Sequence, residues 1–370
     1  MLGLYVHVPF CLRKCPYCSF YSVRYDEGTA ESYTRALIRN IKEYRGRGLK
    51  ADTLYFGGGT PSLLTPAQIG DIIEECRLAF TLDDAEITLE ANPCTVDAEK
   101  LRSFRAAGVN RLSFGIQSAD DGRLGFLGRL HDYDTAVRAV NDAAAAGFEN
   151  ISGDIMLGAA GEDCDTLRAT VGELCSLPLK HISAYMLKIE EGTPFDNDKV
   201  KSLTADDDLM SELYLTAVEE LEKRGFMQYE ISNFAREGYE SRHNNKYWEC
   251  EKYLGFGAAA HSFSEGRRYC CPPDVKLFIE SDVQPCEVTE AEVNGAEEYI
   301  LLGLRLTKGI SLERVAGYFC EKSAENIRRL AETYSKHGLV ILDGDRLSLT
   351  AKGFLVSNSI IAEFIDAAYS

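Results

Sequence analysis

Short apolar runs alternate with longer stretches of helical periodicity over roughly the first 235 residues of the chain. The apolar runs are rich in Val, Ile, Tyr and Phe, which predicts β-strands. Strands and helices that alternate at this spacing predict parallel strands joined by crossover helices. We therefore expect an α/β fold whose six units form a barrel or partial (β/α)6 barrel, with its chemistry at the carboxyl ends of the strands. The predicted strands are Leu4–Val8, Thr53–Phe56, Glu86–Glu90, Arg111–Ile116, Ile151–Leu157 and His181–Ile189.

Capping residues mark the ends of the predicted helices. Thr65, Pro66 and Gln68 form the pattern of a capping box with proline at the first helical position, which predicts that a helix starts there. Gly108 follows a helical run and fits the left-handed position that ends a helix.

The pattern changes in the last third of the chain. We expect the barrel and its extension to occupy residues 1–263, a linker to cover 264–290, and a small α+β domain to occupy 291–370. Three helical stretches followed by two short strands around Asp343-Gly344 resemble a winged helix. Residues 286–370 hold nine Lys and Arg against thirteen Asp and Glu, a net charge of −4. This charge disfavours DNA binding and favours a packing or substrate-covering role.

Composition narrows the function further. Of the 370 residues 45% are hydrophobic, enough for a large core, and the formal net charge is −18. Such a charge repels nucleic acid and anionic membrane surfaces. No run approaches the roughly 18–20 apolar residues of a membrane helix, and no signal peptide is visible. Twelve cysteines without a secretory context indicate thiols and metal ligands in a cytoplasmic protein rather than disulfides.

Three cysteines lie within eight residues, directly after the first predicted strand. Cys11, Cys15 and Cys18 can ligate three irons of a 4Fe-4S cluster, which leaves the fourth iron open. An open position on a metal site permits chemistry, here chelation of S-adenosylmethionine (SAM) through its amine and carboxylate. The alternative is a zinc site that lacks its fourth ligand. His7 is a candidate for that ligand, but it points along a strand. The spacing, with an aromatic residue between the last two cysteines, favours the cluster.

Polar groups follow several of the other predicted strands. The second strand runs into Gly57-Gly58-Gly59-Thr60-Pro61, whose glycines let the backbone approach a ligand closely. Glu90 ends the third strand, Gln117 follows the fourth, and Asp154 lies within the fifth. A buried polar group needs a partner, which is either a ligand or a structural hydrogen bond. Arg129, taken alone, would be an ordinary surface cation.

These residues resemble the branch of the radical SAM superfamily that contains the oxygen-independent coproporphyrinogen III oxidases (HemN) and the haem chaperones (HemW). The resemblance covers roughly residues 3–360. It is carried by Tyr5-Val6-His7-Val8-Pro9-Phe10-Cys11, Phe56-Gly57-Gly58-Gly59-Thr60-Pro61-Ser62, Leu89-Glu90-Ala91-Asn92-Pro93, Arg111-Leu112-Ser113-Phe114-Gly115-Ile116-Gln117-Ser118, Phe126-Leu127-Gly128-Arg129 and Ile182-Ser183-Ala184-Tyr185.

The resemblance assigns roles to residues of this chain. It implies that Tyr5, Gly58 and Glu90 contact the SAM bound to the cluster. Around a second SAM site of the oxidase it matches Tyr17, Gly59, Thr60, Gln117, Arg129 and Asp154. The chemistry agrees, because Glu90 and Asp154 can accept hydrogen bonds from ribose hydroxyls or an ammonium. The guanidinium of Arg129 can donate two parallel hydrogen bonds to a carboxylate.

Three features favour the chaperone branch. Phe20 stands where the oxidase has a further cysteine, and the chain begins three residues before the first predicted strand, without the oxidase's N-terminal extension. The third feature is the segment His243-Asn244-Asn245-Lys246-Tyr247-Trp248, a pattern that the resemblance links with haem binding. His243 could ligate iron, and Tyr247 and Trp248 could flank a flat macrocycle, unless the histidine is structural. We expect His261 to be structural.

Two loops depart from the family pattern. Gly158-Ala159-Ala160-Gly161 and Asn92-Pro93-Cys94 differ from the usual sequences at the active face, which puts the second SAM site in doubt. The remaining cysteines match no cluster or zinc spacing.

The sequence thus predicts a radical SAM protein that binds haem and passes it to an acceptor protein, with an electron donor for its cluster. The alternatives are radical decarboxylation of coproporphyrinogen III and a methyltransferase that uses two SAM molecules. The identity of the acceptor, cleavage of SAM, and formation of a homodimer are left open.

Overall fold

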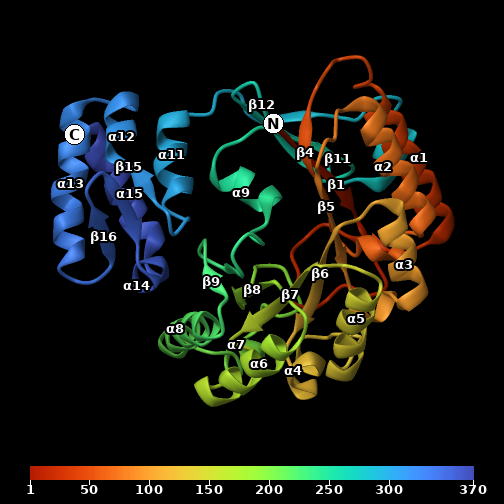
Figure 1. Ribbon diagram of the computed structural model, residues 1–370, viewed down its shortest axis with the longest axis horizontal. Coiled ribbons are helices and arrows are strands. Elements are labelled where there is room, and N and C mark those ends of the chain that lie inside the picture. Colours follow the sequence, from red (N-terminus) through yellow and green to blue (C-terminus); the bar gives the residue numbers. More distant parts are fainter.

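A computed structural model describes all residues from 1 to 370, and a curved sheet dominates it (Figure 1). Six neighbouring strands are parallel and follow one another in the order β1-β4-β5-β6-β7-β8. This arrangement confirms the predicted α/β fold and its partial (β/α)6 barrel. The strands are β1 (Leu2–Val8), β4 (Ala51–Gly58), β5 (Glu86–Ala91), β6 (Arg111–Gln117), β7 (Asn150–Leu157) and β8 (His181–Met186).

The crossover helices line the outer side of this sheet (Figure 1). Each begins at a side chain that caps the free backbone N–H groups of its first turn. The capping box at Thr65 and Gln68 is present, and Gly108 (φ 112°) ends its helix in the left-handed conformation. The helices are α1 (Glu27–Lys42), α2 (Pro66–Ala79), α3 (Ala98–Ala107), α4 (Asp121–Phe126), α5 (Tyr133–Ala145), α6 (Cys164–Ser176), α7 (Asp198–Lys201) and α8 (Asp207–Lys223).

Helical periodicity decides which face of each helix meets the sheet. In α2 the fully buried side chains are Ile69, Ile72, Ile73 and Cys76, spaced three and four residues apart. They join one continuous apolar core with the buried side chains of the strands, which are apolar on both faces as in a covered parallel sheet.

The sheet extends at both edges beyond the predicted strands. Beyond β8 it continues through β10 (Asn233–Ala235) and β9 (Met227–Gln228). Beyond β1 it continues through the parallel strand β11 (Tyr253–Phe256) and then through the antiparallel strands β12 (His261–Ser264), β13 (Arg267–Cys270) and β14 (Glu287–Glu290).

The segment 264–290, predicted to be a linker, is therefore structured. It carries β13, α10 (Val275–Glu280) and β14, and its strands belong to the main sheet. Sequence patterning missed β14 because three of its four residues are exposed, so it shows no apolar alternation.

The C-terminal part packs beside the open side of the barrel (Figure 1). It contains the predicted hairpin, β16 (Val340–Asp343) and β17 (Arg346–Leu349), with β15 (Ile310–Ser311) alongside. The backbone of Ile231 and Tyr229 in the barrel hydrogen-bonds to Arg305 and Thr307. No helix in the chain combines the length and the apolar character needed to cross a membrane. The helices are α11 (Gly295–Gly303), α12 (Leu312–Tyr318), α13 (Glu321–Ser335), α14 (Ala351–Leu355) and α15 (Ser357–Tyr369).

Candidate functional site

The three predicted cluster cysteines lie in the loop that follows β1. Cys11 ends the short strand β2 (Phe10–Cys11), which pairs with β3 (Val23–Arg24). Cys15 and Cys18 follow in a turn closed by a hydrogen bond from the Cys18 N–H to the Cys15 carbonyl (3.1 Å). All three are free thiols. We call residues 11–18 the cysteine loop.

The cysteine loop is fastened to the loop between α4 and α5. Arg13 donates to the Gly128 carbonyl (2.7 Å), and the Arg129 guanidinium lies 3.5 Å from the Cys15 sulfur. Gly128 has a φ of 71° and touches Pro16, where a Cβ would overlap the proline ring at 2.6 Å. These contacts hold the thiols in place before any ligand binds.

A cavity of about 550 Å³ opens beside the cysteine loop, at the carboxyl ends of β4, β5, β6 and β7. This is the edge at which a barrel of this type presents its chemistry. The cavity gathers residues from seven separate segments of the chain. Among its lining residues are Cys11, Cys15, Cys18, Tyr17, Gly58, Gly59, Thr60, Glu90, Gln117, Arg129 and Asp154.

The glycines after β4 allow close approach, although not only to a ligand. A Cβ on Gly59 would lie 2.7 Å from the Phe10 carbonyl oxygen and 2.9 Å from the Phe10 nitrogen. A Cβ on Gly58 would lie 2.5 Å from the His7 ring. The Thr60 N–H donates to the Phe10 carbonyl (2.8 Å). The glycine run therefore positions the cysteine loop against β4, and it also lines the cavity.

Two carboxyl groups face this cavity. Burial raises the pKa of Glu90 to about 7, although a hydrogen bond from the Tyr55 hydroxyl (2.8 Å) favours its ionised form. Burial also raises the pKa of Asp154, which accepts a hydrogen bond from Ser113 (3.4 Å). The buried Arg111 guanidinium opposes both shifts through its charge. A cationic ligand in the cavity would favour the ionised form of both carboxyls.

Gln117 is held in a strained conformation at the cavity wall. It has a φ of 75°, which is rare for a residue with a side chain, and it sits at a register shift between β6 and β7. Its Oε1 atom is buried without a hydrogen-bond partner. Strain and an unsatisfied acceptor at a cavity are typical of a ligand-binding position.

Gln117→Gly should make the ligand-free protein more stable. Glycine adopts the positive φ without strain and removes the unsatisfied Oε1, so we expect the free energy of unfolding to rise by about 1 kcal/mol. Denaturant unfolding measures this change. Gln117→Ala keeps the strained backbone and removes only the amide, which separates the two contributions. A lower stability for the glycine variant would show that the strain argument fails.

Two predicted cofactor residues lie outside the cavity lining. The Tyr5 hydroxyl contacts His7 Nδ1 (3.1 Å), and the Tyr5 ring stacks on Tyr55 at a centroid distance of 6.2 Å. His7 Nε2 contacts the Tyr21 carbonyl oxygen (3.2 Å), so both ring nitrogens of His7 are engaged. Tyr5 thus packs against Tyr55, the residue that hydrogen-bonds Glu90, and is not part of the cavity wall.

His243 is also outside the cavity, and its surroundings do not favour an open haem ligand. It lies in α9 (Arg242–Trp248) and is 1% exposed. Its Nδ1 contacts Thr53 Oγ1 and its Nε2 contacts the Tyr247 hydroxyl, both at 2.8 Å. Burial lowers the pKa of His243 to about 3, so the ring is neutral. His261, in contrast, is exposed on β12.

Sequence reasoning missed the residues that organise the two carboxyl groups. Tyr55 bonds Glu90, Ser113 bonds Asp154, and Arg111 lies buried near both. Arg111 Nε and Nη1 have no hydrogen-bond partner. The sequence did offer one indication of this arrangement, because Arg111 is a charged residue in an otherwise apolar strand. A buried charge needs opposite charges near it, so carboxyl groups could be expected close to Arg111.

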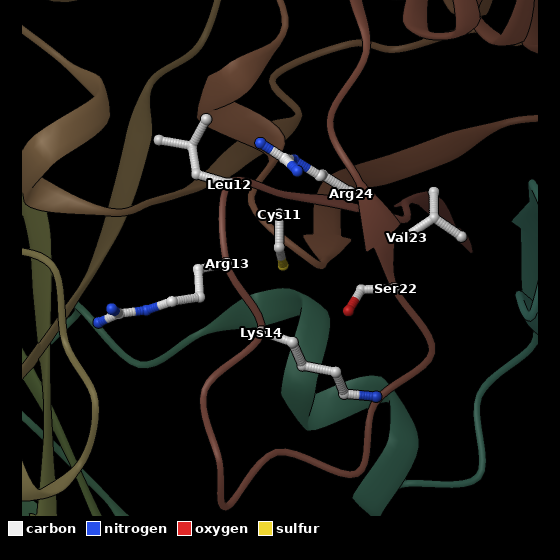
Figure 2. A pocket seen from close by; sticks show the side chains of 7 residues that line it. All are labelled: Cys11, Leu12, Arg13, Lys14, Ser22, Val23 and Arg24. Atoms are coloured by element: carbon white, nitrogen blue, oxygen red, sulfur yellow. The ribbon is translucent and has the colours of Figure 1, made fainter.

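A second, outer cavity of about 460 Å³ reaches the same cysteine (Figure 2). Figure 2 shows the Cys11 sulfur and the Ser22 hydroxyl turned toward its middle. Leu12, Val23 and Arg24 line only this outer cavity, whereas Cys11 lines both.

The donor set fits a 4Fe-4S cluster better than a single metal ion. No three His, Cys, Asp or Glu side chains converge on one point that could hold one ion. Each thiolate would ligate a different iron of the cluster, so the three ligands surround a volume instead of meeting at a point. The three thiols border a cavity and have no disulfide partner, as that geometry requires.

Comparison with known proteins agrees with the fold. The family profile described as the Radical SAM superfamily matches residues 5–174, and the profile described as the HemN C-terminal domain matches residues 294–356. Fold, cysteine loop and profile together define a radical SAM protein.

Several relatives are similar over nearly the whole chain. The "Heme chaperone HemW" of Bacillus subtilis is 34% identical, with 99% of each chain covered. "Radical S-adenosyl methionine domain-containing protein 1, mitochondrial" of Mus musculus is 33% identical over 97% of this chain and 86% of its own. The solved structure of HemN from Escherichia coli shares the fold, with a TM-score of 0.81 and 22% identity over 98% of this chain and 89% of that one. The chain belongs to the HemN/HemW family of radical SAM proteins, and its full-length similarity is to HemW.

Proposed function

We propose that this chain binds a 4Fe-4S cluster, SAM and haem, and that it transfers haem to an acceptor protein. The observation that carries the proposal is full-length similarity to proteins named as haem chaperones, combined with one cavity that unites the three cysteines and the carboxyl groups. We place this activity in the cytoplasm, where cysteines remain reduced.

Cys11, Cys15 and Cys18 would hold the cluster, and the adjoining cavity would hold SAM. The cluster, once bound and reduced, supplies one-electron chemistry. Glu90 would accept from a cationic or hydroxyl group of SAM, supported from behind by Tyr55. The residues matched to a second SAM site, Gln117, Arg129 and Asp154, line the same cavity. Residues matched to the first and to the second SAM site thus line a single cavity. Titration of the reconstituted protein with SAM would measure how many SAM molecules bind there.

Haem ligation by His243 would require the side chains around it to rearrange. The Tyr247 hydroxyl occupies Nε2, and the Tyr247 ring packs edge-on against Tyr253 at a centroid distance of 4.7 Å. Tyr247 therefore does not present a free face to a macrocycle. If His243 is the ligand, the Tyr247 hydroxyl must first leave Nε2.

Tyr247→Phe is the sharp test of this role. It frees Nε2 and keeps the aromatic packing, so haem affinity should rise by about fivefold, the value of one neutral hydrogen bond. His243→Ala should shift the Soret band of the haem complex, whereas His261→Ala should not. Haem titration followed by absorbance measures both quantities. An unchanged Soret band in His243→Ala, or a shift only in His261→Ala, would place the ligand elsewhere.

The proposed function is tested on one anaerobic sample of the full chain with its cluster reconstituted. Haem titration and transfer of haem to an apo-haemoprotein should both succeed, and coproporphyrinogen III should not be consumed. Turnover of coproporphyrinogen III without haem binding would instead identify an oxidase. Transfer of a methyl group from SAM would identify a methyltransferase.

A further inference from the structure

Arg111 places a positive charge in the interior of the barrel. It begins β6 and is 1% exposed. A buried cation normally has an ionised partner, because the loss of its hydration is otherwise uncompensated. Lys246, another buried cation of the chain, forms salt bridges with Asp52 and Glu251. In contrast, Nε and Nη1 of Arg111 have no hydrogen-bond partner. Its charge is therefore not neutralised by a local pair.

The register of the sheet places Arg111 directly behind the cavity beside the cysteine loop. Arg111 and Ser113 are two positions apart on β6, so their side chains lie on the same face of the sheet. Ser113 pairs with Glu90 across β5 and β6, and its hydroxyl donates to Asp154 on β7 (3.4 Å). Ser113, Glu90 and Asp154 line the cavity, whereas Arg111 does not. Arg111 thus lies one layer deeper in the barrel than the two carboxyl groups.

Carboxyl and phenol groups surround this charge. Burial alone would lower the pKa of Arg111, but the facing Glu86 and Asp154 carboxyls and two phenols outweigh burial, and the pKa is raised. In return, Arg111 opposes the rise that burial causes in the pKa of Glu90 and of Asp154. Arg129 acts in the same direction on Asp154, from the lining of the cavity. The phenols are those of Tyr55 and Tyr229.

The other titratable groups that face Arg111 or Glu90 keep their charge state near neutral pH. Burial lowers the pKa of His243 to about 3 and that of His181 well below its usual value, so both rings stay neutral. Burial raises the pKa of every tyrosine in this layer. Glu90 and Asp154 are therefore the groups whose charge Arg111 can set. The tyrosines are Tyr5, Tyr55, Tyr185, Tyr229 and Tyr247.

We propose that Arg111 is a positioning residue of the SAM site, whose buried charge holds Glu90 and Asp154 as carboxylates for the sulfonium and the ammonium of SAM. Arg111 lies behind the two carboxyl groups, so the carboxylates stand between it and a ligand in the cavity. Direct repulsion between Arg111 and SAM is then the smaller effect. This inference rests on the proposed function, because it needs SAM to bind in this cavity.

The test is the pH profile of SAM affinity, measured by calorimetry on the full chain with its cluster reconstituted. Arg111→Met and Arg111→Gln remove the charge and keep much of the side chain's length. Glu90 should then ionise about one pH unit higher, so SAM affinity should be about 5- to 10-fold lower at pH 6–7 and only about twofold lower at pH 8. Arg111→Lys keeps the charge and should keep the wild-type profile. A purely structural role would lower the affinity by the same factor at every pH.

The matched control is Arg123→Met. Arg123 is also buried, and its Nε also lacks a partner, but its charge acts on Glu162 and it does not line the cavity. This variant should keep the wild-type profile. An unshifted profile in both neutral Arg111 variants, or an equal shift in Arg123→Met, would overturn the proposal.

Denaturant unfolding of the cluster-free chain gives a second readout that needs neither cluster nor SAM. A carboxyl whose pKa is raised on folding contributes stability that is lost as pH rises through that pKa. Arg111→Met and Arg111→Gln should therefore lose more stability than the wild type between pH 6 and pH 8. Failure of both variants to fold at either pH would assign Arg111 to the fold and overturn its role in the site. A wild-type protein that binds no SAM at any pH would instead refute the proposed function itself.

Discussion

Alanine at Cys11, Cys15 or Cys18 is expected to abolish the iron–sulfur cluster. Each thiolate would ligate one iron, and the open fourth iron leaves no spare protein ligand to replace a lost one. His7 cannot substitute, because Tyr5 and the Tyr21 carbonyl engage its two ring nitrogens. After anaerobic reconstitution, the iron content of each variant should fall toward zero. The visible absorbance of the thiolate-ligated cluster should be lost with it.

Two cysteines outside the loop provide matched controls. Cys94 is exposed near the same end of the barrel, where its sulfur contacts Asn92, and Cys270 lies on β13. Cys94→Ala and Cys270→Ala should each retain full iron content. If all three loop variants kept a complete cluster, the assignment of the ligands would be wrong. Loss of iron in Cys94→Ala alone would add that thiol to the site.

The barrel strands could be predicted because burial on both faces makes each strand a continuous apolar run. Leu4, Leu54, Leu89 and Leu112 are fully buried at the centres of four such runs. The edge strands could not be predicted in this way. β13 has no buried residue and β14 is mostly exposed, so neither shows a hydrophobic pattern, and only pairing along the sheet creates them.

The cavity was predictable to the extent that it lies at strand ends. Glu90 and Gln117 are polar groups that follow apolar runs, and parallel strands bring such groups to one edge. The environment of each group was not predictable. Thr53 and His243 are 190 positions apart in the sequence, yet the Thr53 hydroxyl contacts His243 Nδ1. The residues next to His243 in the sequence gave no sign that this ring nitrogen has a partner. The strained φ of Gln117 likewise arises from a register shift between two strands, which the sequence of one strand does not reveal.

Glu90→Gln is expected to weaken SAM binding by roughly 10- to 150-fold while the cluster stays intact. The substitution keeps the shape of the side chain and removes its charge, so it removes one charge-assisted hydrogen bond to a cationic ligand, about 1.5–3 kcal/mol. Glu162→Gln is the matched control, because burial also raises the pKa of Glu162 to about 7, but Glu162 does not line the cavity. Calorimetry on the reconstituted protein measures both affinities.

The raised pKa of Glu90 adds a pH dependence with a defined sign. With a pKa of about 7, the carboxyl of the ligand-free protein is mostly protonated at pH 6 and mostly ionised at pH 8. SAM carries a sulfonium and an ammonium, so its affinity should rise up to about tenfold from pH 6 to pH 8. The ligand-free protein should behave oppositely: a carboxyl whose pKa is raised on folding contributes stability below the unfolded-state value, and this stability is lost as pH rises through about 7. In Glu90→Gln the pH dependence of SAM affinity should flatten, whereas in Glu162→Gln it should persist. The pH dependence of stability should lose only the share of Glu90, because burial also raises the pKa of Glu162 and of Glu230 to about 7. An SAM affinity that is independent of pH in the wild type, or unchanged in Glu90→Gln, would remove this carboxylate from the binding site.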